Sequence, residues 1–545
     1  MPTTTLNNLD FAVLGGYFFL VFAIAAILIF RDRRRSKASA SEDYFLGGRN
    51  MGWFIIGASL FASNIGSEHL VGLAGAGAAG DFPAAQFEIL AAFMLLLLGW
   101  LFVPFYIKSG VFTMPEFLEK RYSKWARGYL SWVSIIAYVI TKISVTIAAG
   151  GIIFTALLGI DFWTGAVIVV VATGLYTILG GLKAVVYTDM IQMFILLGGS
   201  LAITYYGLEA IGGWEEIAVR TDESYTSLWR SFNHESFPWT GIIFGAPILG
   251  VWYWCTDQFI VQRVLAAKNI DQARKGTIFA GYLKLLPLFI FVLPGVVAYA
   301  LSVGENPVLA FPIENGKPLY DAALPLITMQ LLPEGMRGLV VAGLVAALMS
   351  SLSSVFNSCS TLFTIDIYKR YYPETGEKKL VRIGQIATAV LVLLGLAWIP
   401  LLQILEGGLF QKLQSIQSYI SPPIAAVFLL GIFYKRINAL GAKWSLLIGA
   451  VLGATRLLLE LNKTDLTGFL FWFVDINFLH FALLLFLVCS VVLVAVSYAS
   501  VPPTALQVQG ITYSYGAKFQ IQSKFNLGLS IGLILLIFVL WYEFS

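Results

Sequence analysis

The sequence has few charged residues, few cysteines and few histidines. Of its 545 residues, 12% are charged and 58% are hydrophobic, and it contains three cysteines and three histidines. A soluble domain usually carries about 25% charged residues, because its surface must meet water. The composition therefore excludes an ordinary soluble protein and favours a surface that faces lipid. All three cysteines, Cys255, Cys359 and Cys489, lie in apolar segments, so the sequence indicates neither a disulfide framework nor a metal cluster.

Motifs of enzyme chemistry are also missing. The sequence contains no nucleophile–base triad, no phosphate-binding loop and no HExxH motif. The formal net charge is only +4, and the basic residues lie in short segments between apolar runs. We therefore predict no catalytic residue, no enzyme activity and no nucleic-acid partner.

Apolar runs long enough to cross a bilayer fill most of the chain, and we count about 14 of them. The first run is followed directly by Arg31, Arg33, Arg34 and Arg35 and has no basic segment before it, so we expect a retained membrane helix and not a signal peptide. The expected spans are 11–30, 52–78, 85–107, 127–157, 162–180, 185–211, 238–262, 273–302, 335–366, 381–405, 411–434, 439–458, 470–498 and 525–543.

The distribution of positive charge gives an orientation for these spans. With both termini outside, about 26 of the 35 lysines and arginines fall in inner loops, as the positive-inside rule requires. The inner segment 262–275 contributes four of them. We therefore expect a multi-pass protein of the cell inner (plasma) membrane, with both termini outside.

The second span is unusually rich in small and polar residues between Gly57 and Gly80, including Asn64, Glu68 and His69. Such a composition weakens a helix and lets backbone carbonyls turn outward, which is tolerated at membrane depth only around a cavity or an ion. A small-residue face that packs closely against another helix is the alternative. Asparagine, glutamate and histidine in the same stretch favour a binding site.

The seventh span is interrupted in a similar way by Gly245, Pro247 and Gly250, and it carries Asp257. Two interrupted spans five spans apart are the spacing expected of a five-helix inverted repeat. We therefore predict a single transmembrane transporter domain over 1–545. Its parts are a first flanking helix (11–30), two inverted repeats (52–211 and 238–434) and C-terminal flanking helices (439–543).

The ninth span carries a polar face. Ser350, Ser353, Ser354 and Asn357 recur at helical spacing, with Ser351 at the border. Hydroxyl and carbonyl oxygens suit a hard cation such as sodium. Hydroxyls that bond back to carbonyls of their own helix are the alternative.

Ionisable side chains inside spans need partners. Lys142 and Asp257 are expected to form structural ion pairs. Glu88, Lys284 and amides such as Gln414, facing the aromatic Tyr253 and Trp254, would form a pocket for a polyhydroxylated ring, because sugars need several donors and acceptors together with an apolar surface.

Several of these passages resemble the sodium/glucose cotransporters of the solute:sodium symporter family. The resemblance covers roughly 40–460 and is most specific at Gly57–Gly66, Gly181–Asp189, Trp252–Gln262, Gly281–Lys284 and Arg337–Tyr368. It implies an all-α membrane protein with the leucine-transporter-like five-helix inverted repeat, additional flanking helices and about 14 transmembrane helices in all.

Site residues follow from the resemblance, position by position. For the main sodium site they are Ala62, Ile65, Ala347, Ser350 and Ser351, and for a second sodium site Ser63, Asp189, Ser353 and Ser354. For the sugar pocket they are Asn64, His69, Glu88, Tyr253, Trp254, Lys284 and Gln414. Tyr253 also resembles the inner gate, and Leu73, Phe87 and Phe410 resemble the outer gate.

Three positions depart from the resemblance. Gly250 replaces a sugar-contacting polar side chain, Glu68 stands where animal members have glycine, and Thr146 replaces an aspartate. The resemblance implies a monomeric symporter for sodium and a glucose- or galactose-type monosaccharide, with sodium as the co-transported ion. The alternatives are another solute on the same fold (myo-inositol, a sialic acid or another small metabolite) and a solute sensor or sodium conductance.

Overall fold

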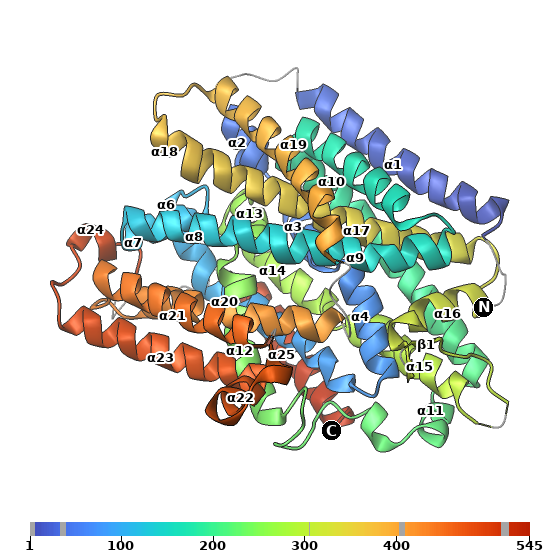
Figure 1. Cartoon of the computed structure of the whole chain (residues 1–545). Coiled ribbons are helices and arrows are strands. Elements are labelled where there is room, and N and C mark those ends of the chain that lie inside the picture. Colours follow the sequence, from blue (N-terminus) through green and yellow to red (C-terminus); the bar gives the residue numbers. More distant parts are fainter. Residues whose placement is uncertain are drawn as a thin grey trace.

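The computed structural model describes residues 6–32, 40–304, 306–314, 316–402, 409–460, 462–513 and 523–545. Helices dominate this part of the chain and run side by side in a single bundle (Figure 1). Two short strands, β1 (Ile313–Glu314) and β2 (Lys317–Pro318), pair antiparallel in a loop.

The helices fall into three groups along the chain. The first comprises α1 (Asn8–Asp32), α2 (Ala40–Leu46), α3 (Trp53–Asn64), α4 (Ser67–Ala78), α5 (Gln86–Leu97), α6 (Val103–Ser109), α7 (Met114–Arg121), α8 (Lys124–Ala137), α9 (Ser144–Ile152), α10 (Phe162–Ile211) and α11 (Glu215–Arg220). The second comprises α12 (Ala246–Gly250), α13 (Gln258–Leu265), α14 (Ile270–Leu283), α15 (Leu293–Ser302), α16 (Ala323–Leu331), α17 (Met336–Thr361), α18 (Lys369–Tyr371), α19 (Glu377–Leu402) and α20 (Leu409–Phe433). The third comprises α21 (Ala439–Glu460), α22 (Gly468–Asp475), α23 (Phe478–Tyr498), α24 (Ala505–Val508) and α25 (Lys524–Glu543).

Eleven helices of the described residues are long and apolar enough to cross a membrane. The count of 14 from the sequence is therefore not confirmed. One difference lies in α10, in which the predicted spans 162–180 and 185–211 form two helical parts that meet at a kink. The kink is at Gly181, whose φ of 57° is left-handed and not helical. The other differences lie at the predicted spans 52–78 and 238–262, which the chain forms as shorter, interrupted helical pieces.

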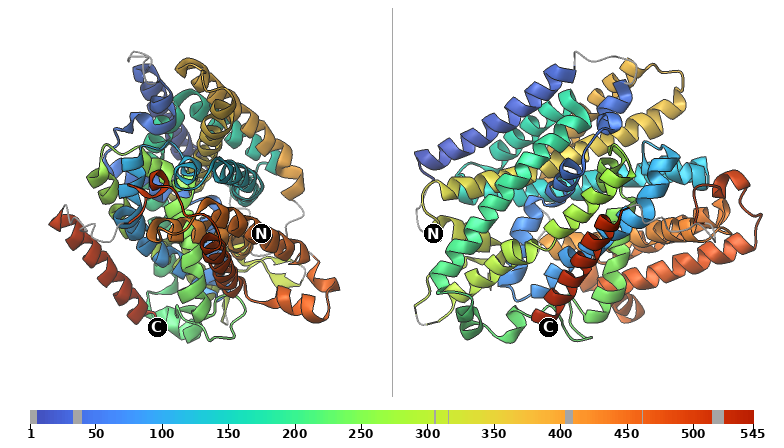
Figure 2. Two further views of the ribbon diagram at one scale, coloured as in Figure 1. Left: turned by 90° about the vertical axis from the view of Figure 1, so that its left-hand side faces the viewer. Right: turned by 180° about the vertical axis from the view of Figure 1, so that it is seen from behind.

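Burial separates a central helix from peripheral ones. In the most apolar part of the span Met336–Tyr371, which includes α17, 94% of the residues are buried. In the corresponding parts of α1 and α25 only 17% and 22% are buried. In Figure 2 the red helix α25 lies apart from the bundle in the left view, and the blue helix α1 runs along its upper edge in the right view. Their outward side chains include Phe19 and Phe538, which are exposed. A bundle with an apolar exterior and a polar centre is the arrangement expected of a membrane transporter.

The peripheral helix α1 is tied to the central helix α17 by polar contacts. Asp10 Oδ1 accepts hydrogen bonds from the backbone N–H groups of Gly335 (2.7 Å) and Gly338 (2.8 Å), so a carboxylate from α1 caps the N-terminus of α17. Further along, the Tyr17 hydroxyl lies 3.4 Å from the Met349 sulfur. These contacts fix both the end and the middle of α17.

Close backbone contact fixes α4 against α15. A Cβ atom added to Gly295 would lie closer than 3.0 Å to the carbonyl oxygen of Ala74, and one added to Gly77 would meet the carbonyl oxygen of Val292 in the same way. Glycine at such positions lets two membrane helices approach to backbone contact. The contact holds α4, which carries part of the candidate site, against its neighbour.

We predict that Gly295→Ala lowers the stability of the purified protein, because the added methyl group meets backbone that cannot rotate away. Overpacking of this kind destabilises by about 1–3 kcal/mol. The measurement is the apparent Tm of the detergent-solubilised protein. Gly198→Ala is the matched control, since its added Cβ would lie 3.8 Å from the nearest side chain. Equal melting temperatures of the two variants would contradict the contact.

Candidate functional site

The polar stretch of the second predicted span lies where α3 ends and α4 begins. Ile65 and Gly66 have extended backbone angles (ψ of 95° and 177°), so the helix does not continue through them. The Gly66 N–H donates to the carbonyl of Asn64 (3.1 Å), whereas an intact helix would direct it to Ala62. The break thus frees the buried Ala62 carbonyl from the usual helical pattern, as expected where backbone lines a cavity or binds an ion.

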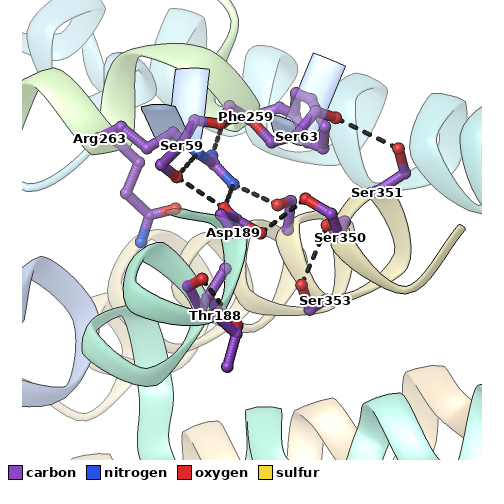
Figure 3. A network of polar contacts seen from close by, with 12 residues as sticks. Ser59, Ser63, Thr188, Asp189, Phe259, Arg263, Ser350, Ser351 and Ser353 are labelled. Atoms are coloured by element: carbon purple, nitrogen blue, oxygen red, sulfur yellow. Dashed lines mark hydrogen bonds and ion pairs between the residues drawn. The ribbon is translucent and has the colours of Figure 1, made fainter. Parts of the chain in front are cut away.

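The serine face of α17 lies directly against this break. The Ser351 hydroxyl donates to the carbonyl of Ser63 (3.2 Å), and the Ser350 hydroxyl donates to Asp189 Oδ1 (2.6 Å), as Figure 3 shows. A hydroxyl that donates its hydrogen on one side keeps oxygen lone pairs for another partner. Both serine oxygens can therefore face a cation between the two helices.

The main sodium set predicted from the sequence falls at this junction. Its members are all buried and lie at the end of α3 or on the facing stretch of α17: Ala62, Ile65, Ala347, Ser350 and Ser351. Neutral carbonyl and hydroxyl oxygens are the ligands that a hard cation prefers. The donor set fits sodium in chemistry.

Asp189 of α10 lies behind Ser350 and is fully buried. Its carboxylate accepts hydrogen bonds from the hydroxyls of Ser59 and Ser350, each at 2.6 Å. The guanidinium of Arg263 lies 3.5 Å from Asp189 Oδ2 and also donates to the Ser354 hydroxyl. A cationic side chain of the protein is thus the partner of this carboxylate.

The four residues predicted for a second sodium site are only partly brought together. Asp189 and Ser354 share Arg263 as a partner. The hydroxyls of Ser63 and Ser353 instead donate to the carbonyls of Ser59 and Ser350 in their own helices. For Ser353 the structure shows the back-bonding that was the alternative interpretation of the serine face on the ninth span.

A cavity adjoins the break in α3. Of the residues predicted to bind sugar, those that line it are Asn64, His69, Glu88, Tyr253, Trp254 and Gln414. Ser63 and Ser351 line it as well, so the cavity reaches the candidate sodium junction. Solute and ion would therefore bind next to each other.

Lys284 is placed behind the cavity wall. Its ammonium is completely buried and donates to both Glu88 and Asn64. The Asn64 amide in turn donates to the Tyr253 hydroxyl (3.0 Å). Because Lys284 neutralises Glu88, this wall presents an amide, a phenol and a paired carboxylate instead of a free positive charge.

Two of the departures from the family resemblance contact each other. The Thr146 hydroxyl donates to Glu68 Oε2 (3.2 Å), and His69 Nδ1 lies 3.6 Å from Glu68 Oε1. Glu68 and Thr146 both line the cavity. A carboxylate on one helix paired with a hydroxyl on its neighbour stands here in place of the glycine and aspartate expected from animal members.

The second interrupted span forms the Tyr253 side of the cavity. Its π-helical segment (Val251–Thr256) ends at Asp257, whose carboxylate caps α13 by accepting from the Phe259 N–H (3.1 Å). Lys142 lies 3.3 Å from Asp257 Oδ2, and its ammonium lies 4.2 Å from the Tyr253 ring centroid and 3.6 Å from that of Phe259. Lys142 and Asp257 thus form the kind of buried ion pair that was predicted for them, directly against the predicted gate residue.

The predicted outer-gate residues are placed differently from one another. Phe87 lines the cavity and packs against Phe237 with ring centroids 6.1 Å apart. Leu73 is fully buried in α4. Phe410 lies near the start of α20, and its side chain is outside the described part of the chain.

Two residues of this network were missed from the sequence. Ser59 lies one helical turn before Ser63, inside a stretch that was already singled out for its polarity. Arg263 was counted among the basic residues of an inner loop, but it lies in α13 and is 1% exposed. The glutamines one and five residues before it, in an otherwise apolar segment, are the signal that could have identified a buried polar helix.

Comparison with known proteins identifies a family. Residues 44–449 match the model of the "Sodium:solute symporter family". The sodium/glucose cotransporter 1 of Ovis aries is 40% identical over 550 residues, covering 93% of this chain and 81% of the relative. The sodium/myo-inositol cotransporter of Homo sapiens is 39% identical over 549 residues, covering 93% and 76%.

Two solved structures share the fold. An outward-open, substrate-bound Na+-coupled sialic acid symporter aligns with a TM-score of 0.77 at 23% identity, covering 91% of this chain and 99% of that one. MHP1, a nucleobase-cation-symport-1 family transporter in a closed conformation, aligns with a TM-score of 0.54 at 14% identity, covering 87% and 99%. Both have the leucine-transporter-like architecture, so the predicted fold class is confirmed.

We predict that Lys284→Met alone destabilises the protein by about 3–5 kcal/mol, because it leaves Glu88 buried without its cationic partner. The double variant Lys284→Met/Glu88→Gln removes both charges and should recover most of that loss. The apparent Tm in detergent, without solute, reports both effects. An equal loss in the single and double variants would show that the pair is not electrostatically coupled.

Proposed function

The chain belongs to the sodium:solute symporter family and so couples solute transport to sodium, and we propose that its solute is a neutral monosaccharide of the glucose or galactose type. One observation carries this proposal. A single cavity joins amide, phenol and indole side chains, with Glu88 neutralised by Lys284, to the serines that face the break in α3.

The chemistry of the cavity supports a sugar. Gln414, Asn64 and His69 offer donors and acceptors for ring hydroxyls, while Trp254 and Tyr253 offer apolar faces for the C–H side of the ring. Lys284 is paired with Glu88, and Lys142, which lines the cavity, is paired with Asp257, so each of these two cations already has a carboxylate partner. The relatives named as sodium/glucose cotransporters, which align with nine-tenths of the chain, add weight.

For sodium, we propose the carbonyls of Ala62, Ile65 and Ala347 with the hydroxyls of Ser350 and Ser351 as ligands. The ion would hold the end of α3 against α17 and so complete the neighbouring solute cavity. Sodium and solute would then favour the same conformation, which is the thermodynamic requirement for coupling.

We propose alternating access between two gates. Phe87 with Leu73 and Phe410 would close the outer side after the solute binds, and Tyr253 would close the inner side. The two inverted repeats, 52–211 and 238–434, would rock against each other around the binding site, with 11–30 and 439–543 as flanking helices.

The sodium gradient supplies enough free energy for accumulation. One ion that crosses about 100 mV releases about 2.3 kcal/mol, and a tenfold gradient adds about 1.4 kcal/mol. Together these sustain roughly 500-fold accumulation of solute at tight coupling. A second ion per cycle would square that ratio, so the number of ions decides how dilute a source the cell can use.

The remaining assignments are part of the same proposal. The chain would lie in the plasma membrane of a bacterium, surrounded by lipid, with both termini outside and functional as a monomer. We propose no enzyme activity for it.

Myo-inositol is the second candidate solute, because a relative named for it is 39% identical over nearly the whole chain. It is also a polyhydroxylated six-membered ring, so the same cavity chemistry would serve it. Competition of unlabelled glucose, galactose and myo-inositol against radiolabelled glucose in proteoliposomes separates the two candidates.

We predict that Ser351→Ala lowers the apparent sodium affinity of uptake at least tenfold, because it removes a proposed ligand from the junction with α3. The measurement is the sodium dependence of solute uptake into proteoliposomes. Ser360→Ala is the matched control on the same helix, since that hydroxyl donates to Gly384 of α19 instead. Unchanged sodium affinity in Ser351→Ala and Ser350→Ala would rule out the proposed main site.

We predict that Gln414→Ala raises the KM for the sugar several-fold while the sodium affinity changes less, because its amide lines the solute cavity but not the junction of α3 with α17. Uptake at varied sugar and at varied sodium gives both values. A larger effect on sodium than on sugar would contradict the placement of Gln414 in the solute site.

A further inference from the structure

The guanidinium of Arg263 is the centre of a buried polar network that connects four helices. It extends from α13 and is bonded to Ser59 of α3 (Nε to Oγ, 2.8 Å), to Ser354 of α17 and to the carbonyl of Phe259 in its own helix. Its Nη2 also lies 3.5 Å from Asp189 of α10 (Figure 3). Arginine stays charged even when buried, so this is a fixed positive charge.

The partners of this charge overlap with the residues that the family resemblance assigns to a second sodium ion. Asp189 and Ser354 belong to that set, and both contact the guanidinium. Ser59 completes the arrangement, because its hydroxyl donates to Asp189 and its oxygen accepts from Arg263. A carboxylate and hydroxyl oxygens that would hold sodium therefore already hold a cation of the protein itself.

Two positive charges at one buried carboxylate repel each other strongly, because the protein interior screens charge poorly. We propose that Arg263 is a tethered cation that excludes sodium from Asp189 in this conformation, and that sodium gains access to Asp189 only when Arg263 withdraws. The inference rests on the proposed function, since it concerns the second ion of the transport cycle.

The position of Arg263 in the fold indicates what moves it. It lies in α13, which begins at the break after Asp257, beside the predicted gate residue Tyr253 and the Lys142–Asp257 pair. A change in the angle of α13 during gating would carry the guanidinium away from Asp189. The state of the gate would then decide which cation the carboxylate holds.

The test is equilibrium binding of radioactive sodium to the purified protein in detergent. Arg263→Gln should bind an additional sodium ion, or bind sodium at least tenfold more tightly, because Asp189 has lost its competitor. The double variant Arg263→Gln/Asp189→Asn should return to the wild-type isotherm. Superimposable isotherms for Arg263→Gln and the double variant would overturn the proposal.

Arg263→Lys is the matched control for charge. It keeps the positive charge and should bind sodium as the wild type does, whereas an added sodium ion in this variant would contradict exclusion by charge. If Arg263→Gln is unstable, its folded yield should rise more in sodium over choline than that of the double variant, which keeps only the proposed main site. An equal rise in the two variants would count against the proposal.

A further comparison separates this inference from the proposed function. Ser351→Ala in the Arg263→Gln background removes a proposed ligand of the main site but leaves Asp189 intact, so the added sodium binding should remain. If neither Arg263→Gln nor Arg263→Gln/Ser351→Ala binds sodium, the additional site is refuted. Absence of sodium binding in the wild type, with binding gained in Arg263→Gln, would refute the main site and support the role of Arg263.

Discussion

The hydrogen bond from Ser351 of α17 to the Ser63 carbonyl at the end of α3 is the contact on which the rest of the site depends. A helix that stops in the middle of an apolar bundle exposes carbonyls that require a polar partner. The central helix α17 supplies that partner with hydroxyl groups instead of charges. The junction itself is therefore lined by neutral oxygens, and the charged Asp189–Arg263 pair lies directly behind Ser350.

Charge in the bundle is handled in pairs that join different helices. Lys284 of the α14 end meets Glu88 of α5, Lys142 meets Asp257 at the start of α13, and Arg263 meets Asp189 of α10. A buried ion pair is weak evidence for stability, because the desolvation of both groups offsets much of their attraction. The two side chains must nevertheless stay close together, since separating them leaves two buried charges without partners. Such pairs favour a small number of discrete arrangements over a continuum, which suits a transporter that alternates between states.

Much of this organisation could be predicted from the sequence. The broken second span, the interrupted seventh span and the serine face of α17 follow from glycine, proline and hydroxyl residues at unfavourable places for lipid, and the structure brings the first and third together. Arg263 was assigned to a loop, because a positive residue at the edge of an apolar run is more often a loop residue. Gln258 and Gln262 could have indicated a buried polar helix, but the partners Asp189 and Ser354 lie in distant segments and could not be identified from the sequence. The helix count differs because α10 joins two predicted spans through the kink at Gly181, and because the predicted spans 52–78 and 238–262 form shorter, interrupted helices.

The cap that α1 places on α17 has a consequence for the modularity of the protein. Residues 44–449 carry the family match, yet Asp10 lies outside them and binds the first N–H groups of the central helix. The segment that matches the family model is thus shorter than the segment whose contacts hold α17 in place, because the latter includes α1. A chimaera that exchanged only residues 44–449 with a relative would combine α17 of one protein with α1 of the other, and so with a different residue at the position of Asp10 unless that relative also has a carboxylate there. A functional chimaera should therefore include α1 together with residues 44–449.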